Sequence, residues 1–276
     1  MDEISKKFDL NIEKILENWE VYHALREIIA NALDEQELTK TKDIEILKNP
    51  LGEWHIRDFG RGIKYEHLTQ NENSEKLSNP NLIGKFGIGL KDALATFNRK
   101  GVNVLIKSRH GDITLGSAHK YGFDDITTLH AYISVPSNPN LVGTVFQLKG
   151  ASSEDIDKAR KLFLKFSGEL VVEHTKYGDI LKRVDSVAKI YINGVKVAEE
   201  FNFLFSYNIT ALDSKIKKAL NRERANVGRG AYSDREKALL LSSNSEVVAK
   251  KLIEDLRTFS TRRTHDELQW LDVQEQ

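Results

Sequence analysis

Three polar side chains that could form a reactive site line one edge of a predicted helix. Within residues 24–34, apolar side chains recur at the spacing of one helical face. Glu27, Asn31 and Asp34 fall at positions i, i+4 and i+7, along the edge beside that face. The pattern places a carboxylate, an amide and a second carboxylate in line, which indicates a site on this helix.

A buried carboxylate is predicted at the end of the following strand. Trp54, Ile56 and Asp58 alternate, so Asp58 points to the same side of the strand as the apolar residues. A carboxylate among inward-facing residues needs a hydrogen-bonding partner. It is followed by Gly60 and Gly62.

A second glycine cluster precedes an apolar helical pattern. Residues 84–91 read Gly-Lys-Phe-Gly-Ile-Gly-Leu-Lys, and apolar residues at helical spacing follow them. Glycines that lead into a helix let backbone amides approach an anion such as phosphate. Together, the two clusters and the polar helix edge favour a nucleotide site.

The order and spacing of these groups resemble the nucleotide-binding motifs of the GHKL superfamily. This superfamily includes gyrase, the ninety-kilodalton heat-shock chaperone, histidine kinases and the mismatch-repair protein MutL. The resemblance covers about half of the chain and rests on four motifs, which are Glu27-x-x-x-Asn31-x-x-Asp34, Asp58-x-Gly60-x-Gly62, Gly84-x-x-Gly87-x-Gly89 and Gly143-Thr144.

The resemblance implies ATP and Mg²⁺ as ligands and gives each position a role. Asp58 would accept a hydrogen bond from the adenine amino group and disfavour guanine. Asn31 would bind Mg²⁺, and Glu27 would orient or deprotonate the attacking water. The remaining residues of the implied nucleotide site are Asp34, Gly60, Gly62, Ile63, Gly84, Lys85, Phe86, Gly87, Ile88, Gly89, Lys91 and Thr144.

The elements that must position these residues predict an α/β protein. Strand-like runs outnumber helices in residues 1–150 and do not alternate with them, which favours a two-layer sandwich of a mixed, mostly antiparallel sheet with helices on one face. The family resemblance implies a Bergerat-type ATP-binding fold for this domain. Residues 63–83 are interpreted as a lid over the phosphates, and residues 1–19 as an amphipathic, helix-spaced N-terminal arm that could exchange between partners.

A second domain is expected over residues 151–276. Its clearest feature is a hairpin over residues 188–197, where Asn193-Gly194 suits a two-residue turn. This half resembles, in topology, the smaller α/β transducer domain of the gyrase and MutL branches. Two C-terminal helices are predicted to begin at capping boxes, Ser233-x-x-Glu236 and Ser243-x-x-Glu246.

A basic cluster in the second half offers a cation for the γ-phosphate. Asn221-Arg222-Glu223 resembles the chaperone loop whose arginine reaches that phosphate, so Arg222 is assigned a catalytic role. MutL and gyrase use a lysine for this purpose. The other candidates in the cluster are Lys215, Lys217, Lys218 and Arg224, and a solvated helix end or a nucleic-acid contact remain open alternatives.

Composition narrows the class of protein. The 276 residues carry 41 basic and 41 acidic side chains, so net charge gives no argument for nucleic acid or an anionic membrane. With no cysteine, disulfides and thiolate chemistry are excluded. No signal peptide or spanning apolar run is found, so we expect a cytoplasmic protein without a membrane partner.

Two functions of different classes fit these observations. The first is an ATPase of the gyrase, chaperone and MutL branch, in which ATP closes the lid, pairs two subunits as a homodimer and moves the second domain. The second is an ATP-binding kinase or a non-hydrolysing regulatory binder of the histidine-kinase type. Glu27 and the transducer-like second half favour the ATPase. A purely structural nucleotide is a third alternative, and the biological task, with a protein or nucleic-acid partner, is left open.

Overall fold

The protein is an α/β protein that divides into two compact units. The computed structural model describes residues 4–10, 18–69, 79, 82–84, 89–220, 227–258 and 264–275. Unit 1 is Met1–Arg160 and unit 2 is Lys161–Gln276. The boundary falls after Arg160, beyond the expected position at residue 150, because helix α5 (Ser153–Arg160) packs on helix α1 (Val21–Thr39) of unit 1.

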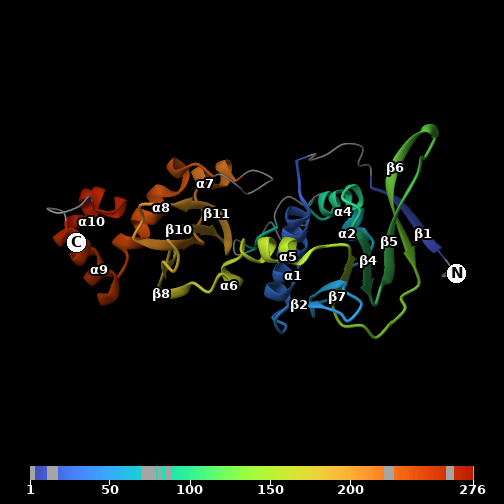
Figure 1. Ribbon diagram of the computed structural model, residues 1–276, viewed down its shortest axis with the longest axis horizontal. Helices are drawn as coiled ribbons and strands as arrows, with labels where there is room; N and C mark the ends of the chain where they lie inside the picture. Colours follow the sequence, from blue (N-terminus) through green and yellow to red (C-terminus); the bar gives the residue numbers. More distant parts are fainter. Residues whose placement is uncertain are drawn as a thin grey trace. The chain divides into compact units, whose positions relative to one another are not determined.

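Unit 1 contains a seven-stranded sheet in the order β1-β6-β5-β4-β7-β3-β2 (Figure 1). The strands are β1 (Ile4–Asp9), β2 (Glu45–Lys48), β3 (Trp54–Arg57), β4 (Asn103–Ser108), β5 (Gly111–Lys120), β6 (Phe123–Ser134) and β7 (Thr144–Lys149). Every pair of neighbouring strands is antiparallel. The expected mixed sheet is therefore wrong for this unit, because β7 lies between β3 and β4 and runs antiparallel to both.

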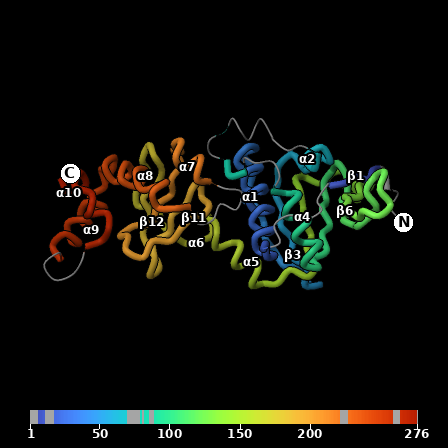
Figure 2. Tube along the Cα trace, turned by 90° about the horizontal axis from the view of Figure 1, so that it is seen from above, coloured from blue at the N-terminus to red at the C-terminus, as the bar shows by residue number. Residues whose placement is uncertain are grey.

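The two faces of this sheet differ in polarity because side chains alternate along each strand. Ile56 and Phe146 are register partners and both are buried, as are Ile106 and Leu148 on the same face. Helices α1 and α4 (Gly89–Arg99) pack against each other, α1 contacts β3 and α4 contacts β4 (Figure 2). A short helix, α2 (Glu66–Thr69), lies in the described part of the segment 63–83 that was predicted as a lid.

The N-terminal segment is a strand where helix-like spacing was expected. β1 pairs with β6 at one edge of the sheet, from Ile4 opposite Ser134 to Asp9 opposite His130. Leu10, directly after β1, and Trp19, shortly before α1, are both buried, so the chain packs on unit 1 at these two positions. Residues 11–17, which carried most of the predicted helical pattern, lie outside the described residues.

Unit 2 contains a five-stranded mixed sheet in the order β11-β10-β12-β9-β8. The strands are β8 (Leu170–Thr175), β9 (Gly178–Lys182), β10 (Ala188–Ile192), β11 (Val195–Glu200) and β12 (Phe205–Ile209), and only the β10 and β12 pair is parallel among them. The predicted hairpin is confirmed, since Asn193 and Gly194 have positive φ between β10 and β11.

Helices of unit 2 pack on this sheet around an apolar core that includes Phe205, Tyr232, Leu239 and Val248. The helices of this unit are α6 (Leu164–Ser167), α7 (Ser214–Ala219), α8 (Arg229–Leu241), α9 (Glu246–Arg257), the 3₁₀ helix η1 (Asp266–Gln269) and α10 (Leu271–Glu275), of which α6 has no buried residue. Both predicted capping boxes are wrong. Helix α8 begins after Gly228, and the cap of α9 is Ser245, whose hydroxyl accepts from the amide of Val248.

Candidate functional site

Helix α1 meets the start of the second glycine cluster through Asp34. The side chain is 1% exposed, and its two oxygens accept the backbone amides of Ile83 at 2.6 Å and Gly84 at 2.7 Å. Each carboxylate oxygen of Asp34 therefore binds one backbone amide at the start of the cluster, ahead of Gly87 and Gly89. This geometry makes Asp34 an anchor of the loop.

Glu27 lies two turns earlier on the same helix and reaches the start of α4. Its Oε1 accepts from Nε and Nη2 of Arg26, at 3.0 and 2.8 Å. Its Oε2 faces Gly89, where a Cβ atom would collide with the carboxylate. Glycine at position 89 therefore lets the Glu27 carboxylate approach the first turn of α4, and Arg26 fixes the other oxygen.

Asp58 follows β3 and is 5% exposed, as its position among inward-facing residues predicted. Its Oδ1 accepts from the amides of Gly60 at 2.9 Å and Thr144 at 3.3 Å. Burial raises the pKa of Asp58 above its ordinary value, and the hydrogen bonds from Gly60 and Thr144 act in the opposite direction. Gly143 has φ +80°, and a Cβ there would overlap the carbonyl oxygen of Asp58, so only glycine lets β7 pass this close.

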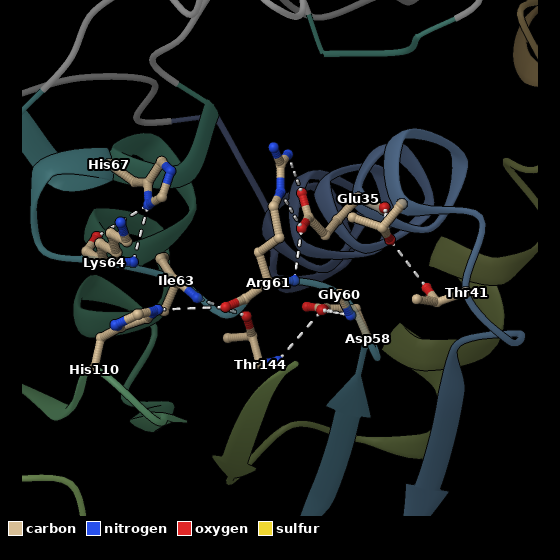
Figure 3. A network of polar contacts seen from close by, with 11 residues as sticks. Glu35, Thr41, Asp58, Gly60, Arg61, Ile63, Lys64, His67, His110 and Thr144 are labelled. Atoms are coloured by element: carbon tan, nitrogen blue, oxygen red, sulfur yellow. Dashed lines mark hydrogen bonds and ion pairs between the residues drawn. The ribbon is translucent and has the colours of Figure 1, made fainter. Parts of the chain in front are cut away.

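The loop after Asp58 is held from both sides (Figure 3). From α1, Glu35 accepts from the backbone amide of Arg61 at 2.8 Å and from its guanidinium at 2.9 Å. From β7, the Thr144 hydroxyl accepts from the amide of Ile63 at 3.0 Å. The Ser108 hydroxyl donates to the carbonyl of Ile63 at 2.7 Å. Contacts from α1, β4 and β7 therefore fix this loop.

The structure brings most of the sequence-predicted residues of unit 1 to the same helix edge and its surroundings. Asn31 is half-buried on α1 between Glu27 and Asp34, and Lys91 is half-buried in the first turn of α4. The predicted residues Lys85, Phe86, Gly87 and Ile88 lie outside the described residues.

The predicted phosphate-binding cations belong to unit 2. Arg222 and Arg224 lie outside the described residues. Lys215 forms an exposed ion pair with Asp234 at 2.6 Å, and Lys217 and Lys218 are exposed on α7. The choice among these cations stays a prediction.

Sequence reasoning missed two side chains that shape the site. Glu35 directly follows Asp34 on α1. The sequence signal for its role was the cation Arg61, which lies between Gly60 and Gly62 in the motif that begins at Asp58. Arg26 is 3% exposed and its guanidinium lies 5.2 Å over the Trp19 ring. The sequence signal for this role was the position of Arg26, a basic residue beside the apolar face of the helix and directly before Glu27.

Two absences concern the described part of the chain. No group of three or more His, Cys, Asp or Glu side chains is arranged there to hold a metal ion. No helix within those ranges has the length and apolar content needed to cross a membrane.

Similar proteins come from Mycoplasma pneumoniae. Residues 154–246 match the family described as Mycoplasma pneumoniae MPN635 N-terminal domain. A protein of that organism, named "Uncharacterized protein", is 41% identical over 240 residues, which cover 85% of this chain and 96% of the relative. A second protein with the same name and source is 33% identical over 131 residues, which cover 46% of this chain and 36% of that relative.

Proposed function

The chain belongs to the family of the Mycoplasma pneumoniae protein with which it shares 41% identity over 240 residues, and we propose that its unit 1 binds ATP and hydrolyses it. The proposal assigns unit 1 to the Bergerat-type fold of the GHKL superfamily and unit 2 to the transducer-like role. It includes Mg²⁺ and an ATP-dependent homodimer.

One observation carries this proposal: one side of α1 meets the glycine-containing loop after Asp58 and both described ends of the second glycine cluster. Glu35 binds the amide of Arg61, Asp34 binds the amides at residues 83 and 84, and Glu27 faces Gly89. Backbone amides and glycines gathered along one polar edge are suited to a phosphate chain. We assign to Glu27, at the end of this edge, the activation of a water molecule near the terminal phosphate.

Each residue then has a chemical task. The second carboxylate oxygen of Asp58 is the acceptor that we assign to the adenine amino group, while Oδ1 stays with the two backbone amides. Oε2 of Glu27, the oxygen that Arg26 does not hold, would orient the attacking water and take its proton.

Asn31 lies on α1 between Glu27 and Asp34, and its amide oxygen is the protein ligand that we assign to a magnesium ion held mainly by phosphate oxygens and water. Mg²⁺ held there would supply positive charge against the phosphates.

The test pairs ATP binding with phosphate release, in the presence of Mg²⁺, for the wild type and Glu27→Ala. We expect the variant to bind ATP and to release phosphate about 10²- to 10⁴-fold more slowly, because the general base is lost. Glu37→Ala is the matched control, since Glu37 is an exposed acid on the same helix that pairs with Lys40. It should leave both quantities unchanged.

Two results would contradict the proposal in different ways. If the wild type binds no ATP, the nucleotide site itself is wrong. If the wild type binds ATP and releases no phosphate, hydrolysis is wrong, and the kinase or regulatory-binder alternative takes its place.

A further inference from the structure

A hollow of about 330 Å³ opens on the polar face of the unit 1 sheet. Its walls include Arg57 on β3, Val145 on β7 and Lys107 on β4. Side chains alternate along a strand, so Arg57 and Val145 point away from the buried face that carries Ile56 and Phe146. The hollow therefore lies on the opposite side of the sheet from α1, and none of the residues assigned to ATP lines it.

Arg57 is held in place without an acidic partner. Its Nη2 donates to the carbonyl of Val142 at 3.3 Å, and its guanidinium carbon lies 4.5 Å from the centre of the Phe59 ring. Glu45 is its register partner on β2 but forms its ion pair with Lys42, at 3.1 Å. Among the described residues no carboxylate forms an ion pair with Arg57, and Glu45, which also lines the hollow, is paired with Lys42.

A second cation stands two strands away in the same row. Val145 is the register partner of both Arg57 and Lys107, which places the two cations on either side of one apolar side chain. Neighbouring strands lie about 4.8 Å apart, so the two backbones are separated by roughly 10 Å, enough for one small anionic group between the side chains. Lys107 donates to the Ser137 hydroxyl at 3.3 Å, and its nearest acid is Asp112 at 4.0 Å.

Apolar side chains complete the hollow. Leu47 on β2 is 60% exposed at its rim, and Leu141 contributes from the segment between β6 and β7. A site with two cations and an apolar wall favours a ligand that has both an anionic group and an apolar part. The volume lies at the small end of the usual range for ligand pockets, about 300 to 1,000 Å³.

We propose that this hollow binds a small organic anion, whose carboxylate or phosphate lies between Arg57 and Lys107 and whose apolar part contacts Leu47, Leu141 and Val145. The planar guanidinium of Arg57 can donate two parallel hydrogen bonds to either group. The binding does not depend on ATP, because the site is on the other face of the sheet.

The test is an NMR titration of the full chain, observed at its backbone amides. Benzoate and phenyl phosphate are the probes, and benzamide is the neutral probe of matched shape. We expect both anions to shift the amide resonances of Arg57, Lys107 and Val145, with affinity at least about tenfold higher than that of benzamide, because charge-assisted hydrogen bonds are the stronger ones. The stronger of the two anions identifies carboxylate or phosphate as the preferred group.

Variants assign the binding to the two cations. Arg57→Gln and Lys107→Gln should each weaken benzoate binding about tenfold or more. Lys149→Gln is the matched control, because Lys149 is an exposed cation on β7 that does not line the hollow, and it should bind benzoate as the wild type does. If Arg57→Gln does not fold, Lys107→Gln carries the same test.

The proposal is overturned if benzamide shifts these resonances as strongly as benzoate, or if both glutamine variants keep the wild-type affinity. It is also overturned if the resonances respond to an RNA oligonucleotide or to protein concentration but to neither anion, because a macromolecular surface would then be the correct assignment.

Discussion

Buried carboxylates occur in both units, and they are used differently. In unit 1, Asp34 and Asp58 accept backbone amides of glycine-containing loops at the edge of the sheet. In unit 2, Glu267 accepts the amides of Leu204 and Phe205 at 2.7 and 3.1 Å and the hydroxyl of Tyr207 at 3.1 Å, inside the core. Its role is to attach the C-terminal segment to β12.

Burial raises the pKa of acids in both units, including Asp58 in unit 1. Burial raises the pKa of Glu267 to about 7 and that of Glu236 well above its ordinary value, and the negative charge of Glu200 adds to the effect on Glu236. Glu236 is 0% exposed, and neither of its oxygens has a hydrogen-bond partner among the described residues. A raised pKa of a buried acid therefore does not by itself identify a functional site. The segment whose amides the carboxylate binds is the more informative observation.

The largest effect that tests this comparison is expected at Asp34. Asp34→Ala leaves the amides of Ile83 and Gly84 without their acceptor, which should cost about 2 to 6 kcal/mol in the free energy of unfolding of unit 1. ATP binding should weaken as well, because the loop is no longer held. Urea denaturation and calorimetric ATP titration measure the two effects.

Asp43→Ala is the control for this substitution, because Asp43 is an exposed acid of the same unit that accepts a hydrogen bond from Gln36. It should change either quantity little. If Asp34→Ala destabilises unit 1 but binds ATP with wild-type affinity, the proposed link between the anchor and the nucleotide site is wrong.

The next effect concerns the pH dependence of unit 2. The native state holds the proton of Glu267 more tightly than the unfolded state, since its pKa rises from 4.5 to about 7. The stabilisation is complete below pH 4.5 and is lost as the pH rises through about 7, a loss of about 3 kcal/mol. Glu267→Gln should remove this part of the pH dependence, while Glu236, whose pKa burial also raises, keeps its own contribution.

Fluorinated tryptophan reports each unit separately in this experiment. Trp270 is the one tryptophan of unit 2, with its ring centre 6.2 Å from that of Phe203, and Trp19 and Trp54 lie in unit 1. When urea unfolding is followed by the fluorine signal of Trp270, the midpoint should lie at a lower urea concentration at pH 8 than at pH 5. An equal midpoint at the two pH values would show that Glu267 titrates normally.

An intermediate effect on affinity is expected at Asp58. Asp58→Asn replaces a pure acceptor by an amide that can also donate, so ATP affinity should fall by roughly 10- to 100-fold and discrimination against GTP should decrease. In the wild type, ATP affinity should fall on acidification at a higher pH than for an ordinary aspartate, because burial raises the pKa of Asp58. Equal ATP and GTP affinities in the wild type would contradict the assigned role.

The contrast between the units also explains what the sequence could predict. Period-two alternation predicted the burial of Asp58, and Asn193-Gly194 predicted its hairpin, because both signals are local. The antiparallel sheet of unit 1 was not predictable in full, since the position of β7 between β3 and β4 depends on contacts far apart in the chain.

The same limit applies to individual acids. Glu236 fits a capping-box pattern, yet it lies inside α8 and faces the core, because tertiary packing decides which face of a helix is buried. Glu35 shows no pattern of its own, and its role depends on Arg61, 26 residues away along the chain. Patterns within one element could be predicted from the sequence, whereas these pairings between elements could not, because they depend on residues far apart in the chain.

The smallest effect is expected at Arg61, where the same loop is held by a backbone and a side-chain contact to Glu35. The Arg61 side chain is 51% exposed, so its ion pair should contribute about 0.2 to 1 kcal/mol. Arg61→Ala keeps the backbone amide that donates to Glu35 at 2.8 Å, and ATP affinity should change less than about threefold. Glu35→Ala removes the acceptor of both contacts and should have the larger effect. If Arg61→Ala weakens ATP binding as much as Asp34→Ala does, the guanidinium itself contacts the nucleotide, and Glu35 serves to aim a cation at the phosphates.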